Sequence, residues 1–254
     1  MMFSGDSPRK YRRVFVAAEE VLSDRVKLSE ANRIYVYEAL RLEPGDLLIA
    51  SDGSRSFLVR LNIKKKNELW ADIEREIETS CDAAVRISLA FGCVRPDPIE
   101  QILRHCTELG VERFIPILFE RCNRKPQVRK ERWSNIINSA CSQSGRLVTP
   151  TIFDPVTLDH FLEMPEDEGT RIFMDGPSAS VTLLGALQGQ SSKSVTLVVG
   201  PEGGITKNEK RLLESSGFFG VSIGPAILRT ETAAIVGSGL ALVLATEKEL
   251  KKLP

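Results

Sequence analysis

The stretch LVVGPEGGITKNE, Leu197–Glu209, decides the fold, because it joins a buried apolar strand to a helix through one tight turn. Within the turn, Pro201 stiffens the bend, while Gly203 and the glycine after it permit backbone angles and close approaches that a β-carbon forbids. Thr206 and Glu209 then have the T-x-x-E spacing of a capping box, which starts a helix sharply. A strand that passes directly into a helix is typical of a parallel sheet covered by helices.

The same alternation of strand and helix runs from about Cys81 to the end of the chain. AVRISLAF and RFIPILF are typical of buried strands, and PIEQILRHCTEL between them places its apolar residues on one helical face. We therefore expect residues 76–254 to form an α/β domain, with a parallel sheet and helices on both of its faces. The apolar helical face comprises Ile99, Ile102, Leu103, Cys106 and Leu109.

Residues 1–75 have a different pattern, in which short β-type runs are separated by turn signals. The pair Asp52-Gly53, between the runs LLIAS and SFLVRLNI, is a typical hairpin turn. This pattern predicts a small, mostly antiparallel barrel or sheet, which we interpret as an appendage that grips a substrate.

Length and composition indicate an ordinary globular protein, with 254 residues, 42% of them hydrophobic and 27% charged. The longest nearly apolar run, Ala233–Ala245, is interrupted by Gly237, Ser238 and Gly239 and is shorter than the roughly 20 residues that span a bilayer. It predicts a buried helix and no membrane association. The N-terminal MMFSGDSPRKYRR lacks an apolar core of the secretory kind, so we expect a cytoplasmic protein.

Metal and nucleophile motifs are not found in the sequence. The five cysteines are scattered and never spaced as C-x-x-C, which favours small buried hydrophobes over disulfides or zinc ligands. His105 and His160 have no acid or cysteine at ligand spacing, and neither H-E-x-x-H nor G-x-S-x-G occurs. We therefore expect no metal site and no serine hydrolase chemistry.

Charge is balanced overall, with a formal net charge of +0, but it is unevenly placed. The segment RCNRKPQVRKERW, Arg121–Trp133, has six basic residues and one acid. Smaller basic groups are Arg9–Arg13 and Lys64–Lys66. Each group alone could be a solvated loop, but three together in a neutral protein favour contact with a phosphate backbone.

Three glycine-bearing turns follow strands of the second domain, at the edge where parallel sheets bind ligands. They are DGPSAS (Asp175–Ser180), GPEGG (Gly200–Gly204) and IGPAILRTETAA (Ile223–Ala234). Neither G-x-x-x-x-G-K-[ST] nor G-x-G-x-x-G occurs, so nucleoside triphosphates and dinucleotides are disfavoured. What remains is a small ligand such as an adenosine moiety, held by backbone groups and apolar walls, or else three ordinary turns.

LVVGPEGGITKNE followed by GFFGVSIGPAILRTETAA resembles the paired signature of the ribosomal RNA small-subunit methyltransferase E family. This family is the uridine-N3 branch of the knotted SPOUT enzymes. The segments ILRHCTELGVERFIPILFERC and ERWSNIINSACSQSGRLVTP, with the N-terminal runs, are similar to the family in order and spacing, so the resemblance covers nearly the whole chain.

The resemblance implies a PUA-like RNA-binding barrel in residues 1–75 and, in residues 76–254, a domain with a deep trefoil knot. It also implies a homodimer and S-adenosylmethionine as the cofactor, bound at the knot. The cofactor-binding residues that it implies are Val199, Gly200, Glu202, Gly203, Ile223, Gly224, Ile227 and Leu228.

The reaction that the resemblance implies is methylation of uridine N3 in 16S ribosomal RNA, within the small ribosomal subunit. Uracil N3 carries a weakly acidic proton, so Arg229 is expected to stabilise negative charge on the flanking carbonyls, and Glu231 to accept a proton or orient Arg229. The alternatives are an ion pair within the loop for Arg229 and helix-terminus electrostatics for Glu231. The expected RNA contacts are Arg12, Arg13, Arg121, Arg124, Lys125, Arg129, Arg132 and Arg146.

Three departures from the family pattern are His105 and Ala226, where basic residues are usual, and Ser142-Gln143, where Glu-Gln is common. The lost positive charges are expected to weaken or retarget RNA binding, whereas the cofactor turns are intact. Two alternatives therefore stay open. Instead of a uridine-N3 methyltransferase, the chain would then be a non-catalytic RNA-binding protein on a SPOUT scaffold, or a SPOUT enzyme that methylates another base or a ribose 2′-hydroxyl.

Overall fold

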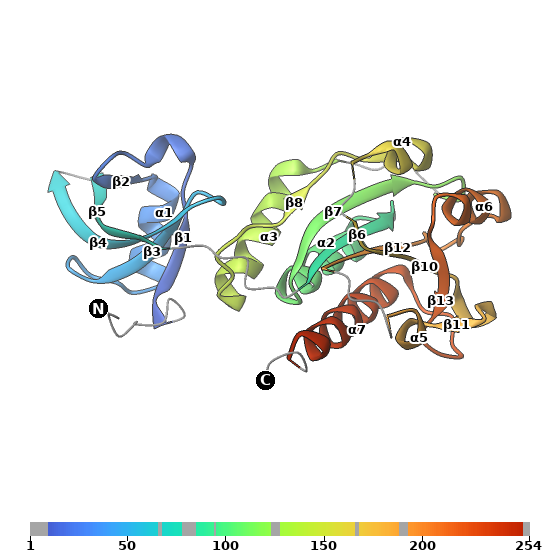
Figure 1. Cartoon of the computed structure of the whole chain (residues 1–254). Helices are drawn as coiled ribbons and strands as arrows, with labels where there is room; N and C mark the ends of the chain where they lie inside the picture. Colours follow the sequence, from blue (N-terminus) through green and yellow to red (C-terminus); the bar gives the residue numbers. More distant parts are fainter. Residues whose placement is uncertain are drawn as a thin grey trace. The chain divides into compact units, whose positions relative to one another are not determined.

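A computed structural model describes residues 10–65, 68–77, 85–93, 95–122, 128–165, 168–187 and 193–250; for residues 63–65, 68 and 245–250 it describes the backbone alone. The chain divides into two compact units (Figure 1). One unit comprises Met1–Asp82 and Cys141–Thr149, and the other Ala83–Ala140 and Pro150–Pro254. Contacts therefore group a short segment from the middle of the chain with the N-terminal residues.

The first unit contains a five-stranded sheet in the order β1-β3-β4-β5-β2. The parallel pair is β1 with β3, and the other pairs are antiparallel, which confirms the expected mostly antiparallel sheet. Its strands are β1 (Arg12–Phe15), β2 (Arg25–Leu28), β3 (Leu47–Ser51), β4 (Ser56–Lys65) and β5 (Glu68–Ile77). Its helical segments are η2 (Ala18–Glu20), α1 (Glu30–Ile34) and η3 (Tyr35–Ala39).

Side chains pack against both faces of this sheet. Successive residues of a strand point to opposite faces, so each strand contributes to both layers. Val14, Leu48 and Val59 belong to the main core of the unit. Ile49, Leu58 and Ile77 face the other side, where the partly buried Leu147 packs against them. The segment Cys141–Thr149 thus covers the second face of the N-terminal sheet.

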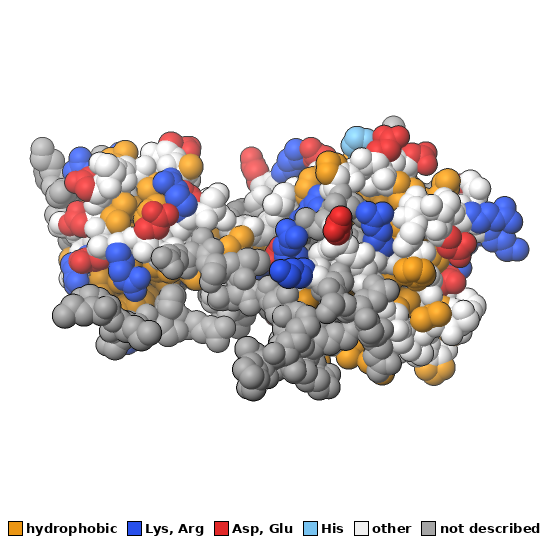
Figure 2. All heavy atoms as spheres, in the orientation of Figure 1, with side chains coloured by type: hydrophobic (Ala, Val, Ile, Leu, Met, Phe, Trp, Pro, Cys, Tyr) orange, Lys and Arg blue, Asp and Glu red, His pale blue; other side chains and the backbone are white. Residues whose placement is uncertain are grey.

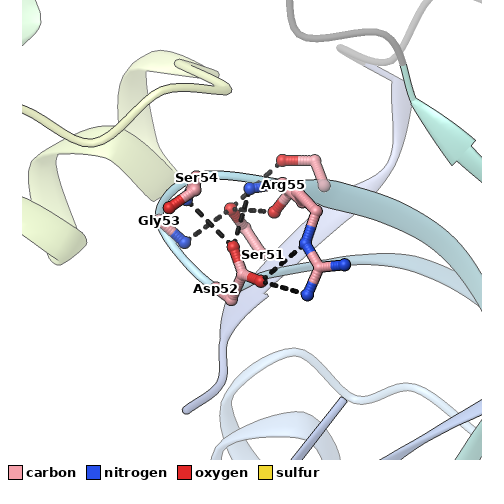
Figure 3. A network of polar contacts seen from close by, with 6 residues as sticks. Ser51, Asp52, Gly53, Ser54 and Arg55 are labelled. Carbon is pink, nitrogen blue, oxygen red and sulfur yellow. Dashed lines mark hydrogen bonds and ion pairs between the residues drawn. The ribbon is translucent and has the colours of Figure 1, made fainter. Parts of the chain in front are cut away.

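The expected Asp52-Gly53 turn joins β3 to β4 (Figure 3). The Asp52 carboxylate accepts hydrogen bonds from the backbone N of Ser54 (2.9 Å) and Arg55 (2.7 Å), and from the Arg55 guanidinium (3.2 Å). The Gly53 carbonyl accepts a bond from Thr149 N at 3.3 Å. The turn therefore holds both the hairpin and the Cys141–Thr149 segment.

The second unit contains a parallel sheet, as the alternation of strand and helix predicted. Its order is β11-β13-β10-β12-β6-β7-β8, and β9 also pairs with β7. The strands are β6 (Arg86–Gly92), β7 (Val111–Leu118), β8 (Thr151–Ile152), β9 (Val156–Thr157), β10 (Thr170–Met174), β11 (Val181–Thr182), β12 (Ser194–Val199) and β13 (Phe219–Ser222).

Helices lie on both faces of this sheet (Figure 1). Phe161 of α4 and Leu213 of α6 join one core, whereas α7 packs against α2 and α5 and against strands β6 and β12. Among the residues described, no helix is long and apolar enough to span a bilayer. The helical segments are α2 (Pro96–Glu108), α3 (Lys130–Ser144), α4 (Leu158–Glu163), η4 (Gly176–Ser178), α5 (Leu183–Leu187), α6 (Lys207–Ser215) and α7 (Thr230–Leu250).

The end of β6 touches the turn after β12 closely enough to require glycine. A β-carbon on Gly92 would lie 2.7 Å from Pro201 Cδ and 2.8 Å from Pro201 Cα. Both atoms belong to a rigid ring and its backbone, so neither can give way cheaply.

We predict that Gly92→Ala lowers the free energy of unfolding by about 1–3 kcal/mol, because it overpacks this contact. The measurement is urea unfolding followed by the fluorescence of buried Trp133, in a Trp70→Phe background. Gly239→Ala is the control, because a β-carbon there would meet Leu109 at an ordinary 3.7 Å. Equal midpoints for the two variants would contradict the steric argument.

The Asp52 turn gives a pH-dependent prediction. Burial raises the pKa of Asp52, but hydrogen bonds from the Arg55 and Ser54 backbone and the Arg55 side chain outweigh burial, so the pKa lies below its ordinary 3.8. The contribution of Asp52 to stability is therefore complete above its ordinary pKa and lost as the pH falls through the lower folded-state value.

We expect Asp52→Ala to lower the free energy of unfolding by about 1–3 kcal/mol at neutral pH, and by clearly less near pH 3. Urea unfolding of the full chain at the two pH values measures the difference. Glu19→Ala, an exposed acid in the same unit, controls for the change in charge. A loss that is the same at both pH values would exclude the carboxylate as its source.

Candidate functional site

Three turns at the carboxyl ends of β10, β12 and β13 line one cavity of about 530 Å³ in the second unit. The turns are the three that the sequence singled out, and the cavity lies where parallel sheets bind ligands. The residues that the three turns contribute include Asp175–Ser178, Gly200–Glu202 and Ile223–Gly224. The strand order brings together segments that are up to about fifty residues apart in the sequence.

Seven of the eight expected cofactor-binding residues line this cavity, although their contact with a cofactor stays a prediction. They are Val199, Gly200, Glu202, Ile223, Gly224, Ile227 and Leu228. Gly203 is not part of the lining. Its carbonyl instead accepts a hydrogen bond from a lining residue, Arg121.

The turn after β12 is tight because it packs against the chain that follows β7. A β-carbon on Gly203 would lie 2.9 Å from Arg121 Cβ and 3.2 Å from the Arg121 carbonyl oxygen. Gly204 has φ +72°, a left-handed conformation that glycine adopts without strain. Gly203 therefore allows the close approach, and Gly204 the backbone angle, that the sequence suggested.

Hydrogen bonds fix three carbonyl groups of this turn. Gly204 N donates to Pro201 O at 2.8 Å, and Arg121 Nη1 donates to Gly203 O at 2.9 Å. The hydroxyl of Thr230, at the start of α7, donates to Gly200 O at 2.9 Å. The turn is thus held by one hydrogen bond of its own and by groups from two other parts of the chain.

The expected capping box forms at the start of α6, and its glutamate has a second partner. Thr206 N donates to Glu209 Oε2 at 2.7 Å, and Glu209 N donates to Thr206 Oγ1 at 3.3 Å. The other oxygen, Glu209 Oε1, accepts from Glu120 N at 2.7 Å, and Glu209 is 3% exposed. This carboxylate joins the helix to the loop after β7.

The two expected catalytic residues lie at the start of α7. Arg229 lines the cavity, yet its side chain is 84% exposed, whereas the Glu231 side chain is 13% exposed and is not part of the lining. Their closest atoms, Arg229 Nη1 and Glu231 Oε1, are 4.0 Å apart. Arg229 is therefore weakly paired and exposed at the cavity, while Glu231 lies in the first turn of the helix.

The sequence did not identify an ion pair between Lys210 and Asp175, which both line the cavity. The turn Asp175–Ser180 was expected near the ligand, but no residue of it was chosen. Lys210 was missed because it has the appearance of an ordinary exposed helical lysine. No local signal singles it out, because Lys207 precedes it at the start of α6 and Glu209 already supplies an acid in that turn.

The expected RNA contacts differ in their surroundings. Arg12 and Arg129 are exposed, and Arg146 is half-buried. Arg132 Nη2 donates to Glu100 Oε2 at 2.7 Å. Figure 2 shows basic side chains interspersed with acidic and apolar ones on both units. Arg124 and Lys125 lie outside the described residues.

Arg13 departs from the expectation of a surface contact, because it is 5% exposed. Strand alternation turns it into the layer between the N-terminal sheet and the Cys141–Thr149 segment. Burial lowers the pKa of its guanidinium, and neither Nε nor Nη1 has a hydrogen-bond partner among the residues described. A phosphate cannot reach such a side chain from the surface.

Two of the cysteines are poor nucleophiles at neutral pH. Cys93 and Cys106 are buried, and burial raises the pKa of each thiol to about 12, so both are protonated at neutral pH. In the part of the chain that the structure describes, no cluster of three His, Cys, Asp or Glu residues could hold a metal ion.

Comparisons with known proteins agree on one family. Residues 81–242 match the model of the RNA methyltransferase domain. The chain is 33% identical over 227 residues to ribosomal RNA small subunit methyltransferase E of Synechocystis, covering 88% of this chain and 75% of that protein. It is 30% identical to the protein of the same name from Aquifex aeolicus, covering 78% of this chain and 86% of that one.

Solved structures give the same result. The ribosomal RNA small subunit methyltransferase E of Neisseria gonorrhoeae, solved bound to S-adenosyl methionine, matches with a TM-score of 0.78 and 29% identity, covering 94% of this chain and 98% of that one. A methyltransferase from Legionella pneumophila, described as putative and solved in complex with the cofactor SAM, matches with a TM-score of 0.76 and 29% identity, covering 92% and 97%.

The contact between α7 and the turn gives a stability prediction. Thr230 is 3% exposed, so Thr230→Val leaves the Gly200 carbonyl without its donor and is expected to cost about 1–3 kcal/mol. Thr230→Ser keeps the hydroxyl and is the matched control. Urea unfolding followed by Trp133 fluorescence compares them, and equal losses would attribute the effect to packing instead.

Proposed function

Because the chain belongs to the ribosomal RNA small subunit methyltransferase E family, we propose that it methylates N3 of a uridine in 16S ribosomal RNA, with S-adenosylmethionine as the methyl donor. The observation that carries this proposal is the cavity lined by three turns, with an exposed arginine at its rim. Two solved relatives with bound S-adenosylmethionine support the choice of cofactor.

The cavity suits an adenosine-containing cofactor. Its volume of about 530 Å³ is within the usual range for small-molecule sites. Ile223, Ile227 and Leu228 supply apolar walls, and the ion-paired Asp175 and Lys210 supply polar groups. We propose that the cofactor is held by these residues together with Val199, Gly200, Glu202, Gly203 and Gly224. The cofactor would supply the methyl group, which it carries on a positively charged sulfur.

Arg229 is proposed to stabilise the uracil ring as its N3 proton is lost. Removal of that proton leaves negative charge shared with the two flanking carbonyl oxygens. A guanidinium stays protonated and offers forked donors to such oxygens, and the Arg229 side chain is 84% exposed at the cavity. Glu231, 4.0 Å from Arg229 Nη1, is proposed to orient it or to accept the proton.

RNA contact is proposed for the basic residues outside the cavity. Arg12, Arg129, Arg132 and Arg146 are placed where part of each side chain meets solvent, and Arg124 and Lys125 extend the same basic segment in the sequence. The target uridine must be unpaired or flipped out of its stack to reach the cavity. We propose that it belongs to the small ribosomal subunit, in the cytoplasm.

A trefoil knot and a PUA-like barrel are the finer features that we propose for the fold. After β13 the chain returns to pack α7 against β6 and β12, and Thr230 bonds the turn that follows β12. This return path supports a knot, in which α7 passes through an earlier loop. The five-stranded N-terminal sheet, with α1 near β2 and β5, supports the barrel.

A homodimer is proposed because α7 has an apolar face that the described residues leave partly exposed. Val236, Leu240 and Val243, at helical spacing, are 41%, 39% and 61% exposed. Ile227, at the cavity, is 89% exposed. A second copy of the chain would cover these side chains and complete the wall of the cavity.

The test is nucleoside analysis of small-subunit ribosomal RNA after incubation with the protein and S-adenosylmethionine, with N3-methyluridine as the expected product. Arg229→Ala is expected to lower kcat by about 10²–10³-fold and to change cofactor affinity by less than about threefold. Arg211→Ala, on α6 and not part of the cavity lining, is the control.

Other outcomes would contradict the proposal in distinguishable ways. A 2′-O-methyl nucleoside or another methylated base would indicate a different target atom. RNA binding without cofactor binding would indicate a non-catalytic protein. Wild-type turnover by Arg229→Ala would remove Arg229 from the mechanism.

A further inference from the structure

We propose that Arg121 is a positioning residue that fixes the cofactor-binding turn, and not a contact to the RNA backbone as its basic segment suggests. The inference rests on the proposed function. It concerns one peptide unit, Gly203–Gly204, and the two groups that hold it.

The Gly203–Gly204 peptide is bonded at both of its polar atoms. Its carbonyl, Gly203 O, accepts from Arg121 Nη1 at 2.9 Å. Its N–H, on Gly204, donates to Pro201 O at 2.8 Å. Opposed hydrogen bonds of this kind fix the plane of a peptide, because rotation would break both of them.

Such fixing is needed at this position, because a peptide between two glycines meets little steric resistance to rotation. Gly204 has φ +72°, a conformation that glycine adopts about as readily as its mirror image, so the sterics of the residue itself do not select it. Pro201 O is itself part of the turn. Arg121 is therefore the donor that holds the peptide from outside the turn.

The guanidinium can hold the turn because its own backbone is anchored. Glu120 N donates to the buried Glu209 carboxylate at 2.7 Å, and Cys122 N donates to Phe119 O at 3.0 Å. Phe119 is 4% exposed in the core shared with α4 and α6. The Arg121 Cβ also lies against Gly203, where a β-carbon would approach to 2.9 Å.

Position and charge agree with this role. Arg121 lines the cavity beside Gly204 and Glu202, although it is exposed to solvent. Its hydrogen bond is charge-assisted and so is stronger than one between neutral groups. A phosphate that took the Nη1 donor would have to displace the Gly203 carbonyl, and would release the turn that we propose holds the cofactor.

The experiment compares Arg121→Met with Arg129→Met in calorimetric titrations with S-adenosylmethionine, without RNA. Methionine keeps an unbranched apolar stem and removes the donors. Arg121→Met is expected to weaken cofactor binding by about tenfold or more, and Arg121→Lys to recover part of the loss. Arg129→Met is expected to leave cofactor affinity unchanged, because Arg129 is not part of the cavity lining.

For RNA binding, the two variants are expected to have the opposite order of effects. We expect Arg129→Met to weaken binding of a small-subunit RNA fragment and to reduce its salt dependence by about one phosphate contact. Arg121→Met is expected to keep the salt slope of the wild type. In turnover assays, Arg121→Met is expected to raise KM for the cofactor more than it lowers kcat. The midpoint of urea unfolding, followed by Trp133 fluorescence, is expected to be unchanged in this variant.

Three results would overturn the inference. The first is that Arg121→Met binds the cofactor as tightly as the wild type. The second is that Arg121→Met binds RNA more weakly, with a reduced salt slope. The third is that Arg121→Met loses cofactor binding only together with a lower unfolding midpoint. A wild-type chain that binds no S-adenosylmethionine, with or without RNA, would overturn the proposed function itself. The two failures are therefore distinguishable.

Discussion

The carboxylate of Glu209 bonds two loops at once, and the geometry of the cavity depends on it. One oxygen accepts from Thr206 N, where α6 begins, and the other from Glu120 N, after β7. A buried carboxylate is stable only when its oxygens are paired, so the two loops satisfy Glu209 as much as Glu209 holds them. The turn Gly200–Gly204, which leads into α6, can then contain glycines and still keep its shape.

The sequence predicted what local patterns determine. The capping box at Thr206 and Glu209, the buried strand before Gly200 and the hairpin turn at Asp52 each depend on neighbouring residues, and each has the expected form. The strand-and-helix alternation also sufficed to predict a parallel sheet, and hence which turns share an edge. That reasoning brought together most of the residues that line the cavity.

Long-range contacts account for what the sequence could not predict. Arg121 and Gly203 are eighty-two positions apart, and nothing in the basic segment indicates that its first arginine bonds a glycine carbonyl. Arg13 belongs to a basic group, but strand alternation and the Cys141–Thr149 segment bury it. The pairing of Lys210 with Asp175 likewise depends on which strands are neighbours.

The contact of α7 with the turn after β12 also has a consequence for protein synthesis. Thr230 and Ala233 contribute to the cavity, and Thr230 bonds Gly200, so the cavity is complete only when the start of α7 is in place. Domains tend to fold in order as the chain leaves the ribosome. The N-terminal sheet can form early, but a nascent chain whose α7 is still inside the exit tunnel has no finished cavity. A newly made molecule therefore has a finished cavity only after the start of α7 has left the exit tunnel and packed against the turn after β12.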